Sequence, residues 1–247
     1  MAYLVAPVMG TTVSIDVRDP DIPATVLEAA VATLRELDAR FSTYREDSEI
    51  RRIERGDLAI ADAHADVREV LDACAVLRVE SDGAFDARRN GCLDPSGYVK
   101  GWAAERAADV LRRAGAAHFA LNLGGDVVCA GGSSADEPWR IGVRHPAEAM
   151  RMAFVLGIRN GAVATSGSYE RGEHVVDART GRPANDWQSI TVVAPDLATA
   201  DAVATAALAM GEHGPAWAAR RPGCDVAAIG HRATLLTTGG LERLRLG

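Results

Sequence analysis

The sequence lacks the long apolar run that a membrane-spanning helix requires. No stretch of about 18 consecutive apolar residues occurs in the 247-residue chain. The first residues carry no basic n-region, and their apolar run is interrupted at Pro7 and Gly10, so they do not resemble a signal peptide. We therefore expect a soluble, cytoplasmic protein with no stable membrane insertion.

Cysteine is also scarce, and its spacing excludes the usual metal-binding patterns. The cysteines Cys74, Cys92, Cys129 and Cys224 are far apart, form no CxxC motif and have no paired histidine nearby. A zinc site is therefore not expected. Reduced, partly buried thiols of a cytosolic protein explain these residues better.

Positive charge is not in excess, and lysine is almost absent. The 27 basic residues face 34 acidic ones, giving a formal net charge of −7 that repels nucleic-acid phosphates, so we expect no nucleic-acid partner. Lys100 is the single lysine, and every other basic residue is arginine. A lone lysine indicates that a compact point charge is needed there. The count alone supports drift in an arginine-rich composition equally well.

What the sequence does contain predicts an α+β fold with largely antiparallel or mixed sheets packed against helices. Helical spacing covers residues 23–41, 65–80, 99–113, 197–210 and 215–220, and a short helix starts at Asp47 or Ser48 and ends at Gly56. Strands are expected at residues 11–17, 118–123, 127–130, 139–143, 152–158, 162–165, 173–176, 189–194, 225–229 and 233–237. Long helices alternate with groups of strands, which differs from regular βαβ repetition.

The segment of residues 94–101, Asp94-Pro-Ser-Gly-Tyr-Val-Lys-Gly101, opens one of these helices. A helix N-terminus offers free backbone N–H groups that suit a phosphate, and Gly97 and Gly101 allow a close backbone approach. Lys100 adds a full positive charge, and Asp94 offers a hydrogen-bond acceptor to a sugar or a base. An ordinary capped helix with a surface lysine is an equally good explanation of this segment alone.

Two polar turns carry weaker signals. Asn122-Leu-Gly-Gly-Asp126 follows a strand but is not GxGxxG, so it does not support a dinucleotide-binding fold, and a plain β-turn is the simpler interpretation. Ser166 lies in Ala164-Thr-Ser-Gly-Ser-Tyr169 with no GxSxG setting, so a hydrolase nucleophile is not supported.

Two further positions have side chains suited to catalysis. His174 has an unperturbed pKa of about 6.5 and is a possible general base, although a lone histidine is more often structural. Asp201 and Thr205 are four residues apart and share one face of an alanine-rich helix. Their oxygens suit Mg²⁺. Taken alone, a helix-dipole aspartate and a threonine bonded back to its own helix explain the pair better.

Together, ordered segments along nearly the whole chain resemble the ApbE-like flavin transferases (FAD:protein FMN transferases). These are Met9-Gly-Thr-Thr12, Phe41-Ser-Thr-Tyr44 with Ser48-Glu-Ile50, Asp82-Gly-Ala-Phe-Asp86, Tyr98-Val-Lys-Gly-Trp102, Asn122-Leu-Gly-Gly-Asp126, Ala164-Thr-Ser-Gly167, residues 174–181 and Ala200-Asp-Ala with Thr205. Each segment is weakly specific, whereas their order is highly specific.

The resemblance implies one ApbE-like (T-fold-like) FAD-binding domain over residues 1–247. It also implies an enzyme that uses Mg²⁺ to transfer FMN from FAD to a threonine or serine hydroxyl of an acceptor protein that carries a flavinylation motif, releasing AMP. The residues that it places against FAD are Met9, Tyr44, Ala84, Phe85, Asp86, Asp94, Lys100, His174 and Thr180. Those that it places at the metal are Gly97, through its carbonyl, Asp201, Ala204 and Thr205. His174, Asp201 and Lys100 would be catalytic, with His174 as the base.

Two departures from the family pattern accompany the resemblance. Asp86 is followed almost at once by Asp94, where the family usually has several dozen residues, and Ala178 replaces a proline. FAD hydrolysis to FMN and AMP, and flavin binding without turnover, remain alternatives. The chain's own Asp177-Ala-Arg-Thr180-Gly181 matches the acceptor pattern only in part, so self-modification is not expected.

Overall fold

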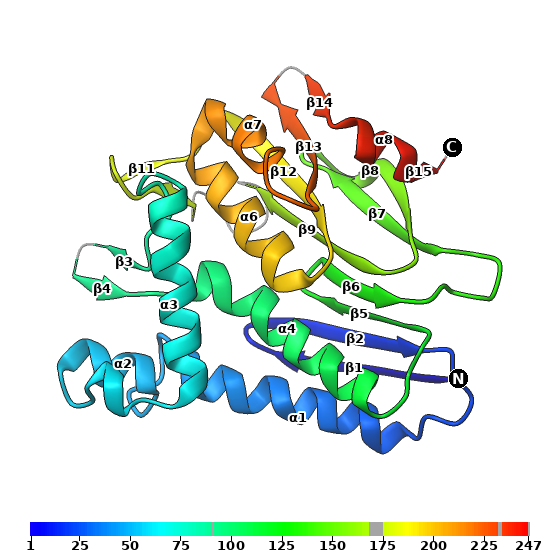
Figure 1. Ribbon diagram of the computed structural model, residues 1–247, viewed down its shortest axis with the longest axis horizontal. Helices are drawn as coiled ribbons and strands as arrows, with labels where there is room; N and C mark the ends of the chain where they lie inside the picture. Colours follow the sequence, from blue (N-terminus) through cyan, green and yellow to red (C-terminus); the bar gives the residue numbers. More distant parts are fainter. Residues whose placement is uncertain (90, 168–174, 232–233, 247) are drawn as a thin grey trace.

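The computed structural model describes residues 1–89, 91–167, 175–231 and 234–246. Its centre is an antiparallel sheet in the order β1-β2-β5-β6-β9-β12-β13-β14 (Figure 1). The strands are β1 (Ala2–Val8), β2 (Thr11–Val17), β5 (Phe119–Leu123), β6 (Asp126–Ala130), β9 (Gly161–Gly167), β12 (Trp187–Ala194), β13 (Asp225–Gly230) and β14 (Leu235–Thr237). The expected α+β class with antiparallel sheets is confirmed.

Helices cover one face of this sheet. They are α1 (Ala24–Phe41), α4 (Ser96–Arg113) and α6 (Leu197–Ala209), with α2 (Glu49–Arg55), α3 (Ala65–Glu80) and α7 (Gly214–Ala218) around them (Figure 1). Helix α1 shows why the helices form here, because Leu27, Val31 and Leu34 recur at helical spacing and are all buried. Their side chains join those of the inner sheet face in the larger hydrophobic core.

A smaller sheet covers the opposite face. It consists of β7 (Trp139–His145), β8 (Glu148–Ile158) and β15 (Arg245–Leu246), in the order β15-β8-β7. Strand β7 alternates buried and exposed residues, as expected for a strand with one covered face. Its buried side chains pack with Val127, Val163 and Ile229 of the large sheet and with Leu241 of α8 (Gly239–Leu244) in a second core.

The helix boundaries follow the expected capping chemistry. The Ser48 side chain accepts a hydrogen bond from the Arg51 backbone N–H at the start of α2, and Gly56 ends that helix in the left-handed conformation. Asp196 caps α6 in the same way, through the backbone N–H of Thr199. The predicted start and end of α2 are confirmed, with Ser48 rather than Asp47 as the N-cap.

Several elements differ from the expected ones. Strand β1, helix α8 and strand β15 were not expected, and α4 begins at Ser96 instead of residue 99. Two small hairpins also appear, β3 (Arg88–Arg89) with β4 (Cys92–Leu93) and β10 (Val176–Asp177) with β11 (Arg182–Pro183). The strand expected at residues 173–176 falls partly outside the described residues, and β10 begins only at Val176.

The chain brings several turns to one end of the large sheet. The β1–β2 turn, the β5–β6 turn and the end of β9 all lie there, because neighbouring strands are antiparallel. The start of α4 and the end of α6 lie at the same end, as the contacts below show. Among the described residues, no helix has the length and apolar character that a membrane crossing requires.

Candidate active site

Two glycines let α4 and α6 cross in close contact. A Cβ atom at Gly101 would lie 2.4 Å from the Leu197 carbonyl oxygen and 2.5 Å from the Asp201 Cβ. One at Gly97 would lie 3.0 Å from the Phe85 ring and 3.2 Å from Thr205 Cγ2. Real Cβ atoms essentially never approach as closely as one at Gly101 would, and one at Gly97 would be unusually tight, so glycine at these positions places Asp201 and Thr205 against the first turns of α4. The close approach expected of Gly101 is therefore made to another helix.

Lys100 lies between two buried carboxylates. Its Nζ donates a hydrogen bond to Asp126 Oδ2 and lies 3.4 Å from Asp201 Oδ1. Asp126 also accepts a hydrogen bond from the backbone N–H of Thr165, at 2.9 Å, and Asp201 accepts one from that of Gly101, at 2.8 Å. Each aspartate is 2% exposed. Residues from α4, α6, β6 and β9 thus form one charged cluster.

Burial strongly affects the charge of Asp201. Desolvation raises the pKa of its carboxyl group, and the nearby Asp126 carboxylate raises it further. The Lys100 ammonium and the hydrogen bond from Gly101 act in the opposite direction. Two buried carboxylates beside one lysine leave an excess of negative charge, which an additional cation would offset.

Hydroxyl groups adjoin this cluster. Thr205 Oγ1 and Ser166 Oγ are 3.0 Å apart and share a hydrogen bond that joins α6 to β9. Thr205 therefore directs its hydroxyl toward the sheet, in contrast to the back-bonding within its own helix that the sequence alone favoured. Ser166 is 8% exposed, whereas Thr205 is half-buried.

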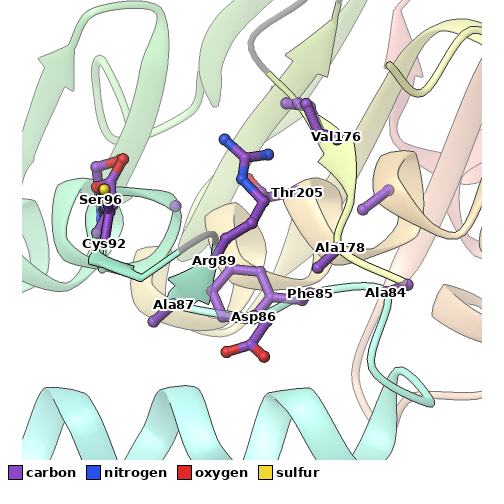
Figure 2. A pocket seen from close by; sticks show the side chains of 14 residues that line it. Ala84, Phe85, Asp86, Ala87, Arg89, Cys92, Ser96, Val176, Ala178 and Thr205 are labelled. Carbon is purple, nitrogen blue, oxygen red and sulfur yellow. Dashed lines mark hydrogen bonds between the residues drawn. The ribbon is translucent and has the colours of Figure 1, made fainter. Parts of the chain in front are cut away.

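A pocket of about 250 Å³ opens beside Thr205 (Figure 2). One wall comes from the 84–97 segment, and the opposite wall from α6 and the β10 strand region. The lining residues are Ala84, Phe85, Asp86, Ala87, Arg89, Cys92, Asp94, Ser96, Gly97, Val175, Val176, Ala178, Thr205 and Ala209. Gly97 and Thr205 thus belong both to the pocket wall and to the α4–α6 crossing.

Comparison with known proteins identifies the family. The ApbE family model matches residues 9–90 and 87–228. The chain belongs to the ApbE family. It is 25% identical to the FAD:protein FMN transferase of Vibrio cholerae, over 85% of this chain and 81% of that protein. It is also 25% identical to the FAD:protein FMN transferase of Haemophilus influenzae, over 83% of this chain and 79% of that protein.

Solved structures of ApbE proteins share the fold. The ApbE protein of Thermotoga maritima superposes with a TM-score of 0.90 at 23% identity, covering 100% of this chain and 99% of that chain. The flavin transferase ApbE of Vibrio cholerae superposes with a TM-score of 0.85 at 23% identity, covering 98% of each chain. The ApbE-like architecture expected from the sequence is therefore confirmed.

Six of the residues that the ApbE resemblance selects line the pocket together. They are Ala84, Phe85, Asp86, Asp94, Gly97 and Thr205. The Ala84 carbonyl accepts a hydrogen bond from the Ala178 N–H at 3.0 Å, which holds the 84–97 wall next to the β10 region. Asp94 Oδ1 accepts a hydrogen bond from the Ser96 N–H at 3.0 Å and so helps to start α4.

The other selected residues lie outside the pocket lining. Lys100 and Asp201 form the buried cluster described above, one helical turn from Gly97 and Thr205. Ala204 is fully buried in α6 and offers no side-chain ligand. Tyr44 is 93% exposed in the loop between α1 and α2. His174 falls outside the described residues.

Met9 and Thr180 occupy two turns. Met9 has a positive φ of 53°, and its backbone N–H donates a 3.1 Å hydrogen bond to Asp38 on α1. Thr180 lies in the exposed turn between β10 and β11, where its hydroxyl accepts a hydrogen bond from the Arg182 N–H at 3.2 Å.

The structure adds residues that sequence reasoning did not select. Asp126 is the principal one, because its turn was interpreted as an ordinary β-turn although its carboxylate holds Lys100. Ser166 was assigned to a polar turn, and Arg89 was given no role. Asp126 and Ser166 lie inside segments that resemble the family, which could have marked them as site residues. Arg89 lies in the shortened connection, where the sequence offered no such indication.

The residues around Asp201 suit a divalent cation that prefers oxygen ligands, such as Mg²⁺. Among the described residues, no group of three or more His, Cys, Asp and Glu side chains converges as a metal cage. Mg²⁺ does not need such a cage, because it binds through one or two carboxylates together with water and substrate phosphates. Asp201 is buried among more negative than positive groups and has the Thr205 hydroxyl one helical turn away, which meets that requirement.

Proposed function

We propose that this protein is a Mg²⁺-dependent enzyme that transfers FMN from FAD to a threonine or serine hydroxyl of an acceptor protein and releases AMP. The observation that carries the proposal is the buried Lys100–Asp126–Asp201 cluster next to a pocket lined by Gly97 and Thr205. Relatives over most of the chain are named FAD:protein FMN transferases, which supports the same activity.

The reaction exchanges the phosphoanhydride link of FAD for a phosphate ester link to the acceptor. The acceptor oxygen forms a bond to the phosphorus of the FMN half, and the bond from that phosphorus to the bridging oxygen breaks. AMP leaves with the bridging oxygen, and the hydroxyl proton passes to a base. We assign this base to His174, because imidazole has the appropriate proton affinity near neutral pH.

The protein's own contribution is positioning and charge. Phosphoryl transfer depends on holding the reactants in line and on neutralising charge more than on covalent chemistry. The Phe85 ring and the backbone of Ala84 offer a wall for the flat flavin. Lys100 is held between Asp126 and Asp201 at the deep side of the site, where its ammonium partly offsets their negative charge and would help to orient Asp201.

The proposed metal ligands are the Asp201 carboxylate, the Thr205 hydroxyl and the Gly97 carbonyl. Bound there, Mg²⁺ would neutralise negative charge on the diphosphate. Asp201 and Thr205 of α6 lie next to Gly97 because glycine at positions 97 and 101 lets α6 approach α4. Ala204 is not included, because its methyl side chain offers no ligand atom. In contrast, the Gly101 N–H that would normally bond to the Gly97 carbonyl donates to Asp201 Oδ2.

A turnover assay tests the proposal. The protein is incubated with FAD and Mg²⁺, with and without a peptide carrying the D-x-x-[S/T]-G-A-T pattern, and AMP and flavinylated peptide are measured. We expect both products to appear together, only with the peptide, and to disappear with EDTA. AMP without peptide would instead indicate FAD hydrolysis. Bound FAD with no AMP under any condition would contradict both enzymatic functions.

A matched pair of variants tests the metal assignment. Asp201→Ala removes the proposed ligand and should lower turnover at least about 100-fold, because several kcal/mol of transition-state stabilisation are lost. Asp109→Asn removes a carboxylate on the solvent side of α4 and should leave turnover unchanged. If the Asp201→Ala protein retains full Mg²⁺-dependent activity, the metal assignment is wrong.

A further inference from the structure

The short β3–β4 hairpin separates two cavities. Successive residues of a strand point to opposite sides, and β3 consists only of Arg88 and Arg89. Arg89 lines the pocket of the candidate active site, whereas Arg88 lines a second cavity of about 480 Å³ against α3. Asp86 and Ala87 line both cavities, so this segment is a thin wall between them.

Arg89 is the single basic residue among the described residues that line the active-site pocket. Figure 2 shows its side chain extending away from the Asp86 carboxylate, toward the part of the pocket that carries Thr205 and Val176. The guanidinium group therefore faces the space that the substrate would occupy.

The acids near Arg89 are engaged by other groups. Asp86 accepts a 2.8 Å hydrogen bond from the Arg78 guanidinium, on the α3 side, and another 2.8 Å bond from the Arg88 N–H. Asp94 is bonded to the Ser96 N–H. Within the described part of the chain, no hydrogen bond or ion pair joins the Arg89 guanidinium to another residue. The pocket thus presents one cation that no protein carboxylate neutralises.

The pocket needs such a cation if it binds a diphosphate. Lys100 is already paired with Asp126 and lies close to Asp201, so two carboxylates offset its charge. A guanidinium group binds phosphate oxygens through two parallel hydrogen bonds, which both attracts and orients the anion.

We propose that Arg89 is a substrate-binding residue that holds the FMN-side phosphate of FAD. The inference rests on the proposed function, because it assumes that this pocket takes the flavin nucleotide. It assigns the phosphate contact to the shortened connection, where the ApbE resemblance selects no residue between Asp86 and Asp94.

Flavin binding provides a test that does not depend on turnover. The wild-type protein, Arg89→Ala, Arg89→Lys and the matched control Arg88→Ala are titrated with FAD, FMN and riboflavin in EDTA, with quenching of flavin fluorescence as the readout. We expect Arg89→Ala to weaken FAD and FMN binding about tenfold, as for loss of a charge-assisted hydrogen bond. Riboflavin has no phosphate, so its affinity should not change.

The control variants define the remaining outcomes. Arg88→Ala should bind all three flavins within about twofold of the wild type, because its side chain faces the other cavity. Arg89→Lys keeps the charge and should recover part of the lost affinity. Unchanged FAD affinity in Arg89→Ala, an equal loss for riboflavin, or an equal loss in Arg88→Ala would overturn the proposal.

The two proposals fail in different ways. A wild-type protein that binds FAD but never releases AMP contradicts the transferase function, while a phosphate-dependent loss in Arg89→Ala still supports the Arg89 contact. A fully active wild type whose Arg89→Ala variant binds FAD normally contradicts only the Arg89 contact.

Discussion

The four cysteines differ in burial, and burial sets how reactive each thiol is. Burial raises the pKa of both Cys74 and Cys129 to about 12 and also raises that of Cys224. The thiolate is the reactive form, so these three are protected. Cys92 is exposed and lines the active-site pocket. All four thiols are free, as the sequence predicted.

We predict that Cys92 is the fast-reacting thiol and that FAD protects it. At pH 8, iodoacetamide should alkylate Cys92 at least about 100-fold faster than Cys74 or Cys129, because their thiolate fractions are very small. Peptide mass spectrometry over a time course measures each rate. Saturating FAD should slow the Cys92 reaction. The same reaction with AMP in place of FAD provides the comparison. Rapid labelling of Cys74 would contradict the burial described here.

At the same scale, local sequence patterns predicted part of the site. The four-residue spacing of Asp201 and Thr205 placed both on one helix face, and the structure confirms that they share it. The Lys100–Asp126 contact had no such pattern, because it joins a helix to a strand 26 residues away. Contacts of this kind depend on how the elements pack, and periodicity does not contain that information.

Among the elements, the α4–α6 crossing determines the geometry of the site. Gly101 faces the Leu197 carbonyl and the Asp201 Cβ, both of which are fixed by α6. Neither is the far end of a flexible side chain, so neither moves aside without cost. The position of Asp201 relative to Lys100 therefore depends on a residue that has no side chain.

Gly101→Ala should destabilise the protein. The added methyl group would overpack the crossing and lower the free energy of unfolding by about 1–3 kcal/mol. Gly239→Ala is the matched control, because a Cβ there meets nothing within 4 Å at the start of α8, and it should not lower stability. Urea unfolding measures both. Equal stability of the two variants would show that the helices are not in close contact.

Amphipathic helices were the elements that the sequence predicted best. The expected residues 65–80 coincide with α3, since its apolar spacing and ends are local properties. Strand β1 was missed because Pro7 interrupts its apolar run, and a proline is tolerated there only because β1 is an edge strand. The β3–β4 hairpin has two residues per strand, too few for any alternation to be recognised.

At the scale of the whole molecule, the two hydrophobic cores share one sheet. Val128 belongs to the larger core and Val127 to the smaller one, on opposite faces of β6. The larger core contains residues from Ala6 to Ala228, so both the N-terminal and the C-terminal parts of the sequence contribute to it. We propose that residues 1–247 form one domain, because neither core is complete without the large sheet.

One cooperative unfolding transition should follow from this shared sheet. Trp102 lies in the larger core and Trp139 in the smaller one. Variants that keep only one of them, with the other tryptophans changed to phenylalanine, report on each core by fluorescence. We expect each variant's fluorescence midpoint in urea to coincide with its own far-UV circular dichroism midpoint. A smaller core that unfolds separately, before the helical signal changes, would contradict the single domain.

In the two-residue strand β3, the side that each arginine faces depends on whether the number of residues before it is odd or even. Inserting one residue between Asp86 and Arg88 would shift the alternation by one position, turning Arg89 toward α3 and Arg88 toward the pocket of the candidate active site. Inserting two would restore the original facing. The doublet Arg88-Arg89 would therefore keep an arginine directed into the pocket in either register, whereas a hairpin with a single arginine would lose it after an insertion of one residue.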